Sequence, residues 1–135
     1  MTTTRVTHAS PAGTYAHIAD RDWENDHAIK SAGADPEKCD DIAEQLILRS
    51  PGQNINVILG GGRREFTPTS VQDPETGSGG RRRDGKNLIE TWKELKKGQR
   101  AQYVWNKSQF DQVNASQVDY LLGKSAINLC KGEDG

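Results

Sequence analysis

Apolar residues recur along this chain in short runs, and two of these runs have the three-to-four-residue spacing of an amphipathic helix. The first helix is predicted from a capping aspartate, Asp40 or Asp41, to about Arg49, with apolar residues four positions apart on one face. The second begins at Asn87 and ends at Gly98, a residue type that commonly terminates helices. Two shorter helices are also expected, over residues 11–19 and 108–113.

Runs of apolar and β-branched residues predict strands between these helices. The run at 55–59 is followed by three glycines and has the composition of a buried strand. A helix followed by a strand, repeated along the chain, is typical of an α/β protein with a mostly parallel sheet. The polar stretches at 20–38 and 63–86 contain glycine and proline and predict loops. The four predicted strands cover residues 2–7, 55–59, 101–105 and 118–122.

Composition limits the size and the class of the protein. With 135 residues and 33% hydrophobic content, one small domain is the natural ceiling. The net charge of −1 argues against a general nucleic-acid or membrane-surface binder, and no segment approaches the roughly 20 apolar residues of a membrane span. Met1 is followed by threonines and an arginine, so no signal peptide is visible. Two cysteines, Cys39 and Cys130, could pair or stay free.

The candidate chemistry lies between residues 2 and 23. A predicted strand there ends in polar residues and leads into a helix, which is where α/β proteins bind ligands and where anions are favoured. Arg21 offers a planar fork of donors that fits a phosphate, but it could instead be a surface arginine that pairs with Asp20 or Asp22. The hydroxyl of Ser10 is a suitable ligand for Mg²⁺, and a helix N-cap is its structural alternative.

Two other stretches contain residues common in nucleotide-binding or nucleic-acid-binding sites, but neither is expected to be such a site. The glycines at 60–62 fit neither of the two glycine-rich phosphate-binding motifs, so a turn or a close backbone approach is expected. The three arginines at 81–83 lie in a glycine-rich stretch, where a solvated loop is expected rather than a nucleic-acid site.

Several separated motifs, in the same order along the chain, closely resemble animal-type alkaline phosphatases. The resemblance begins with the threonine-rich stretch at residues 2–17 and continues through Arg21 and Trp23. It covers roughly residues 2–123, whereas residues 124–135 are expected to be a non-homologous tail. The other matching motifs are Cys39-x-Asp41-Ile42-Ala43-x-Gln45-Leu46, Val57-Ile58-Leu59-Gly60-Gly61-Gly62-Arg63, Arg83-Asp84-Gly85-Lys86-Asn87-Leu88 and Tyr103-Val104-Trp105-Asn106.

This resemblance implies a fold and an activity. Residues 1–123 would be a fragment of the catalytic domain, part of an α/β/α sandwich with a mostly parallel sheet, truncated at both ends. The family hydrolyses phosphate monoesters through a metal-activated serine, with zinc and magnesium as cofactors. This sequence contains neither the family's nucleophile motif nor its histidine-rich zinc motifs, so the fragment alone is expected to be inactive. The alternative is a non-catalytic truncated isoform that acts as a binding or interaction protein.

The resemblance also assigns roles to single residues. Arg21 would clamp the substrate phosphate, Ser10 would contribute to the magnesium site, and His8 would shape that site without ligating the metal. Glu75 would supply a carboxylate to a calcium site, although an exposed loop glutamate is an equal alternative. Cys39 would form a disulfide whose partner lies outside this chain.

The remaining expectations concern modification and cellular setting. Asn106 and Asn114 begin N-glycosylation sequons, and the first coincides with a sequon common in the family. Members form homodimers at the cell surface, held by a GPI anchor, or are secreted. No anchor signal is visible in this chain, and no nucleic-acid partner is expected.

Overall fold

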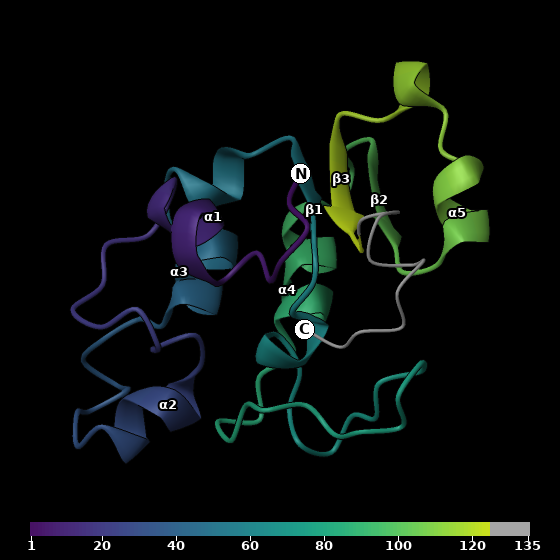
Figure 1. The fold of residues 1–135 in the computed structure, drawn as a ribbon. Coiled ribbons are helices and arrows are strands. Elements are labelled where there is room, and N and C mark those ends of the chain that lie inside the picture. Colours follow the sequence, from purple (N-terminus) through teal and green to yellow (C-terminus); the bar gives the residue numbers. More distant parts are fainter. Residues whose placement is uncertain (125–135) are drawn as a thin grey trace.

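The computed structural model describes residues 1–124; of the predicted tail, residues 125–135 and with them Cys130 lie outside the described residues. Three parallel strands form the central sheet in the order β1-β3-β2 (Figure 1). The strands are β1 (Val57–Leu59), β2 (Ala101–Val104) and β3 (Tyr120–Gly123). The prediction of an α/β fold with a parallel sheet is therefore confirmed, with strand ends one or two residues from those expected.

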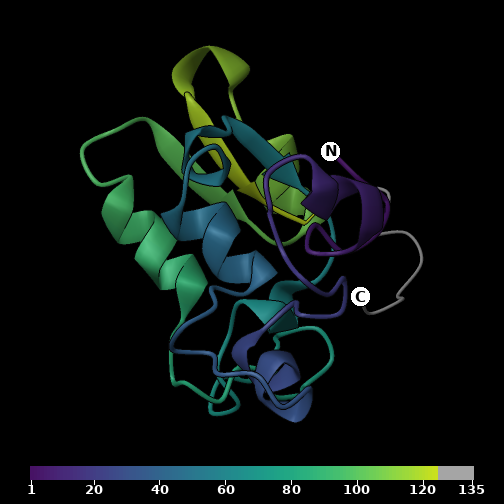
Figure 2. The same cartoon turned by 90° about the vertical axis from the view of Figure 1, so that its left-hand side faces the viewer.

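Helices cover both faces of this sheet (Figures 1 and 2). Successive side chains of a strand point to opposite faces. Ile58 and Leu122 therefore share one face and pack in the larger core, which contains α3 (Ile42–Leu48) and α4 (Leu88–Leu95). On the other face the strand residues pack against Phe110 of α5 (Lys107–Asp111). The buried strand residues of this second, smaller cluster are Leu59, Val104 and Leu121.

The two predicted main helices are capped as their sequences indicate. Asp41 forms a capping box at the start of α3, because it accepts a hydrogen bond from Glu44 N at 2.9 Å and Glu44 Oε2 accepts one from Asp41 N. Asn87 accepts a hydrogen bond from Glu90 N at 3.3 Å at the start of α4. Both helix starts are therefore confirmed.

The N-terminal segment differs from its prediction. Residues 2–7 form no strand, and a single parallel bridge joins Arg5 to Gly61 beside β1. The helix expected over 11–19 is shorter and earlier, α1 (Ala9–Gly13), and Ser10 lies within it. The N-cap position belongs to His8, whose side chain makes no capping hydrogen bond, so the N-cap alternative for Ser10 is wrong. Three backbone hydrogen bonds join residues 2–6 to residues 59–61, but they form one isolated bridge and no continuous strand.

The two predicted loops contain structure that their composition concealed. Helix α2 (Asp26–Ser31) lies inside the stretch 20–38 and is capped by Asn25, which accepts a hydrogen bond from Ala28 N at 3.0 Å. The stretch 63–86 is a long irregular connection below the sheet and α3 in Figure 1, apart from one short turn of helix. Three such 3₁₀ turns occur among residues 1–124: η1 (Gly52–Asn54), η2 (Arg63–Glu65) and η3 (Ala115–Gln117).

The glycines after β1 allow the N-terminal segment to approach the sheet. A Cβ atom on Gly60 would lie 2.5 Å from side-chain carbons of Thr2 and Val6. Gly62 has φ +89°, a conformation that favours glycine. The expectation of close backbone approach at 60–62 is confirmed.

Candidate functional site

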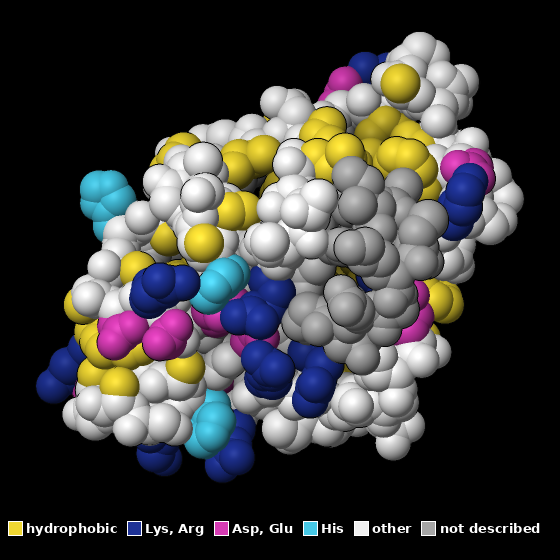
Figure 3. Space-filling model, viewed as in Figure 1, with side chains coloured by type: hydrophobic (Ala, Val, Ile, Leu, Met, Phe, Trp, Pro, Cys, Tyr) yellow, Lys and Arg dark blue, Asp and Glu magenta, His cyan; other side chains and the backbone are white. Residues whose placement is uncertain are grey.

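The predicted phosphate-binding and magnesium residues lie together around α1. His8 immediately precedes the helix, Ser10 is in its first turn, and Arg21 is on the loop that leads to α2. Nη2 of Arg21 lies 3.3 Å from Nε2 of His8. Positively charged side chains gather beside a histidine on this face of the molecule (Figure 3). Within residues 1–124, Arg21 forms no ion pair with Asp20 or Asp22, so the surface-pair alternative is not what the structure contains.

A buried carboxylate lies behind this group. The side chain of Glu24 is 8% exposed and accepts hydrogen bonds from Nε and Nη2 of Arg5, at 2.9 and 2.6 Å, and from Oγ1 of Thr7 at 2.6 Å. Its Oε1 lies 3.3 Å from Nδ1 of His8. Burial raises the pKa of Glu24, but the hydrogen bonds from Arg5 and Thr7 outweigh burial and the net shift of the pKa is downward. Glu24 is therefore a fixed anion at neutral pH.

Ser10 is the one predicted metal-binding residue on this face. It is exposed, and its hydroxyl has no hydrogen-bond partner within residues 1–124, so the oxygen is available to a cation. The described part of the chain contains no group of three or more His, Cys, Asp or Glu residues that could hold a metal ion. A complete magnesium site would therefore need further ligands, and the magnesium roles of Ser10 and His8 stay predictions.

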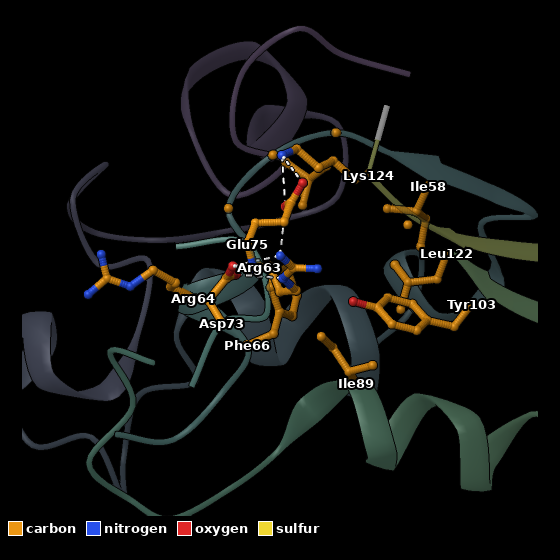
Figure 4. Close-up of a pocket in the computed structure, with 15 residues that line it drawn as sticks. Ile58, Arg63, Arg64, Phe66, Asp73, Glu75, Ile89, Tyr103, Leu122 and Lys124 are labelled. Atoms are coloured by element: carbon orange, nitrogen blue, oxygen red, sulfur yellow. Dashed lines mark hydrogen bonds and ion pairs between the residues drawn. The ribbon is translucent and has the colours of Figure 1, made fainter. Parts of the chain in front are cut away.

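Glu75, the predicted calcium ligand, is occupied by cationic side chains (Figure 4). Lys124 Nζ lies 3.0 and 2.9 Å from its two oxygens, and Arg63 Nη2 donates to Oε2 at 2.8 Å. Asp73, two residues earlier, accepts two hydrogen bonds from Arg63, at 2.6 and 2.8 Å. A calcium ion at Glu75 would have to displace Lys124, so the observed arrangement does not fit calcium.

A small cavity beside this cluster opens at the carboxyl ends of the strands. Its interior is lined by Ile58, Phe66, Ile89, Tyr103 and Leu122, with the charged cluster at its rim (Figure 4). Its volume of about 60 Å³ has room for a water molecule or two but not for an organic phosphate. The phosphate-binding candidate is therefore the exposed α1 face rather than this cavity.

A second charged centre, around Arg82, was not predicted from the sequence. Its side chain is 0% exposed and donates to both oxygens of Asp41, at 3.1 and 2.9 Å, and to both oxygens of Asp84, at 3.2 and 2.6 Å. The expectation of a solvated loop at 81–83 is wrong for this residue. Neighbouring Arg81 donates to the buried carboxylate of Glu65 at 2.7 Å. The only sequence signal was the run of arginines followed by Asp84, which is also typical of exposed loops.

The remaining predicted residues lie apart from the α1 face. Asn106 is the N-cap of α5 and is partly exposed, whereas Asn114 is exposed and accepts hydrogen bonds from Ser116. Cys39 is a free, partly exposed thiol. Its predicted disulfide and both glycosylation sites stay predictions.

Comparison with known proteins supplies the family. A family model described as alkaline phosphatase matches residues 1–129, which is most of the chain. The chain belongs to the alkaline phosphatase family. It is similar to a membrane-bound alkaline phosphatase of Bombyx mori, with 52% identity over 91% of this chain and 22% of that protein. It is also similar to alkaline phosphatases of Gadus morhua, at 42% identity over 26% of that protein, and of Gallus gallus, a tissue-nonspecific isozyme, at 43% over 24%.

The family match confirms the resemblance and the fold class. The chain spans about a quarter of the length of these alkaline phosphatases. The match extends to residue 129 and so includes the first six residues of the predicted tail, ending inside the stretch that the structure leaves undescribed. In the described part of the chain, no helix is long and apolar enough to cross a membrane.

Proposed function

We propose that this chain supplies the phosphate-binding arginine, Arg21, to an enzyme that hydrolyses phosphate monoesters. The supporting observation is the position of Arg21. Its guanidinium is exposed, it is held on one side by His8, and within residues 1–124 it makes no other hydrogen bond. An always-charged fork of N–H donors with free positions can bind two oxygens of a phosphate.

The proposal includes zinc and magnesium as cofactors. The hydroxyl of Ser10 would be one magnesium ligand, and His8 would shape the site beside it. Bound metal ions would stabilise charge on the attacking and leaving oxygens. The resemblance places the nucleophilic serine and the zinc ligands in motifs that this sequence does not contain, so we propose that the 135 residues alone do not catalyse hydrolysis.

Other parts of the proposal concern the protein in its cellular setting. The resemblance supports a homodimer, located at the cell surface or secreted, with N-linked glycans on Asn106 and Asn114 and a disulfide at Cys39. Residues 124–135 are proposed to be a tail foreign to the family, although the family match to residue 129 does not support this for the first six of them. A calcium ion could bind at Glu75 only if Lys124 moved away from it.

Two measurements on the purified chain test the central proposal. Titration with inorganic phosphate should show binding that Arg21→Ala abolishes and that Arg100→Ala, which removes another exposed arginine, leaves unchanged. Binding unaffected by Arg21→Ala would overturn the role of Arg21. A chromogenic phosphate monoester, supplied with Zn²⁺ and Mg²⁺ at alkaline pH, should not be hydrolysed. Hydrolysis that Arg21→Ala abolishes would show that the chain holds a complete catalytic site.

A non-catalytic isoform is the alternative. Such an isoform would associate with full-length subunits, because the resemblance implies a homodimer. Addition of the chain to a full-length alkaline phosphatase would then change its activity or its size in solution, whereas a simple fragment would change neither.

A further inference from the structure

This inference rests on the proposed function, because it concerns how Arg21 is held for phosphate. We propose that Glu24 is a positioning residue for Arg21 and acts through His8. The Glu24 carboxylate selects the His8 tautomer that carries its proton on Nδ1, and Nε2 of that tautomer accepts a hydrogen bond from Arg21.

The donors and acceptors around the imidazole allow only this tautomer to satisfy both sides. A guanidinium donates and cannot accept, so the contact between Nη2 of Arg21 and Nε2 of His8, 3.3 Å apart, is a hydrogen bond only when Nε2 accepts. A neutral imidazole whose Nε2 accepts carries its proton on Nδ1. Nδ1 lies 3.3 Å from Oε1 of Glu24, an ion-pair distance, and 3.4 Å from Nη2 of Arg5. Of these two neighbours, only the carboxylate attracts a proton on Nδ1.

The opposite tautomer has a worse set of contacts. A proton on Nε2 would face the N–H groups of Arg21, and the lone pair on Nδ1 would face the carboxylate of Glu24. Its one favourable contact would be with Arg5, whose same nitrogen already donates to Glu24 at 2.6 Å. The tautomer with its proton on Nδ1 therefore has the better set of neighbours, the carboxylate beside the proton and the guanidinium of Arg21 beside the lone pair.

Glu24 can direct His8 because Glu24 itself is immobilised. Arg5 holds it through two hydrogen bonds, and Thr7, which is 0% exposed, holds it through a third. Asn25, the next residue, caps α2 and fixes the backbone. The chain of contacts runs from this buried anchor, through the partly exposed ring of His8, to the exposed guanidinium of Arg21.

This arrangement would reduce the cost of binding phosphate. A free arginine side chain loses rotamer freedom when a ligand immobilises it. If His8 already restrains Arg21, part of that loss occurs before the phosphate binds, and the N–H groups that do not face His8 remain available to it. Removing Glu24 should then weaken phosphate binding even though Glu24 does not touch the ligand.

Nitrogen-15 NMR of the histidine side chains in the 135-residue chain, at a pH where the imidazoles are neutral, tests this assignment. We expect the Nδ1–H tautomer for His8 in the wild type. His17 and His27, whose side chains have no such partners within residues 1–124, serve as internal references. Glu24→Gln should keep the tautomer because its amide oxygen still accepts, whereas Glu24→Ala should lose it. Glu37→Ala, which removes an exposed glutamate, is the control.

Phosphate titration of the same variants completes the test. Glu24→Ala should weaken phosphate binding by about twofold to tenfold, as expected for one lost hydrogen bond, whereas Glu37→Ala should leave it unchanged. The proposal is overturned if wild-type His8 carries its proton on Nε2, a result that does not depend on whether any variant folds. It is also overturned if folded Glu24→Ala keeps the wild-type tautomer. Failure of the wild type to bind phosphate, with a Glu24-dependent tautomer, would overturn the proposed function but support this arrangement of side chains.

Discussion

Arg82 and Arg21 both lie in irregular stretches between helices, but they differ in burial and in the number of hydrogen-bond acceptors around them. Arg82 is 0% exposed, and its nitrogens donate to two aspartates and to the carbonyl of Glu65. Arg21 is exposed, and its side chain has a single hydrogen bond, with His8, among the described residues. The same side chain therefore holds the structure together in one place and is left available in the other.

This difference shows how to separate a structural arginine from a binding arginine. A buried guanidinium whose N–H groups already have acceptors has nothing to offer a ligand, and its removal leaves carboxylates unpaired. An exposed guanidinium with free N–H groups contributes little to stability and can bind an anion. Arg5 is intermediate, because it is partly exposed and neutralises the buried Glu24.

The largest expected effect is that of Arg82→Met. Loss of the guanidinium leaves Asp41 buried without its ion-pair partner, and we expect a loss of about 3–5 kcal/mol in the free energy of unfolding. Urea denaturation followed by circular dichroism would measure it. Arg100→Ala, which breaks the exposed pair with Asp119, should change the free energy of unfolding little. Equal losses of stability in the two variants would contradict the conclusion that buried and exposed arginines contribute differently to stability.

Acid should reduce the effect of Arg82→Met. Burial raises the pKa of Asp41 to about 7 even against the hydrogen bonds from Arg82, and for Asp84 those hydrogen bonds outweigh burial and lower the pKa. Native Asp41 thus binds more protons than the unfolded chain between about pH 4 and 7, and its contribution to stability decreases as pH rises through that range. The contribution of Asp84 is present above about pH 4 and is lost as pH falls through its lowered pKa.

Arg82 stabilises the ionised form of both carboxyl groups, so its contribution to the free energy of unfolding decreases as they become protonated. The difference in the free energy of unfolding between the wild type and Arg82→Met should therefore be largest above pH 7 and should shrink as the pH falls to 3. Denaturation curves of both proteins at pH 7.5, 5 and 3 would measure this difference. A difference that stayed constant across this range would show that Arg82 acts by packing rather than by charge.

Arg5→Met should have an intermediate effect. Glu24 would keep its hydrogen bond from Thr7 but lose two from Arg5, and we expect a loss of about 1–3 kcal/mol in the free energy of unfolding. Arg5→Met combined with Glu24→Met should recover part of this loss, because no unpaired carboxylate would remain buried. Failure of the double variant to recover stability would indicate that both side chains act mainly through packing.

Arg21→Ala should have the smallest effect on stability. Removal of an exposed side chain with one weak contact should change the free energy of unfolding by no more than about 0.5 kcal/mol. Thermal denaturation would measure this, and phosphate titration of the same sample would show whether binding is lost. A large loss of stability would place Arg21 in the same structural class as Arg82.

The regular elements were largely predictable from sequence, because they depend on local patterns. The capping box of Asp41 and Glu44 and the cap at Asn87 are read directly from residue types at fixed spacings. Helix α2 was missed because its six residues, Asp26–Ser31, include one apolar side chain larger than alanine and so have little periodicity. The predicted strand at 2–7 was wrong, because this segment pairs only with the glycine-containing stretch 59–61 and forms one isolated bridge there.

The sequence alone determined the α/β class, the two main helices and, through its separated motifs, the alkaline phosphatase family. These follow from local spacing and from order along the chain. Only the tertiary structure decided which arginines are exposed and available to bind an anion. Arg82 and Arg21 have similarly polar neighbours in sequence, but Arg82 is buried by aspartates up to 41 positions away, and Arg21 is left at the surface beside His8. Burial depends on contacts between distant segments, and no local pattern contains that information.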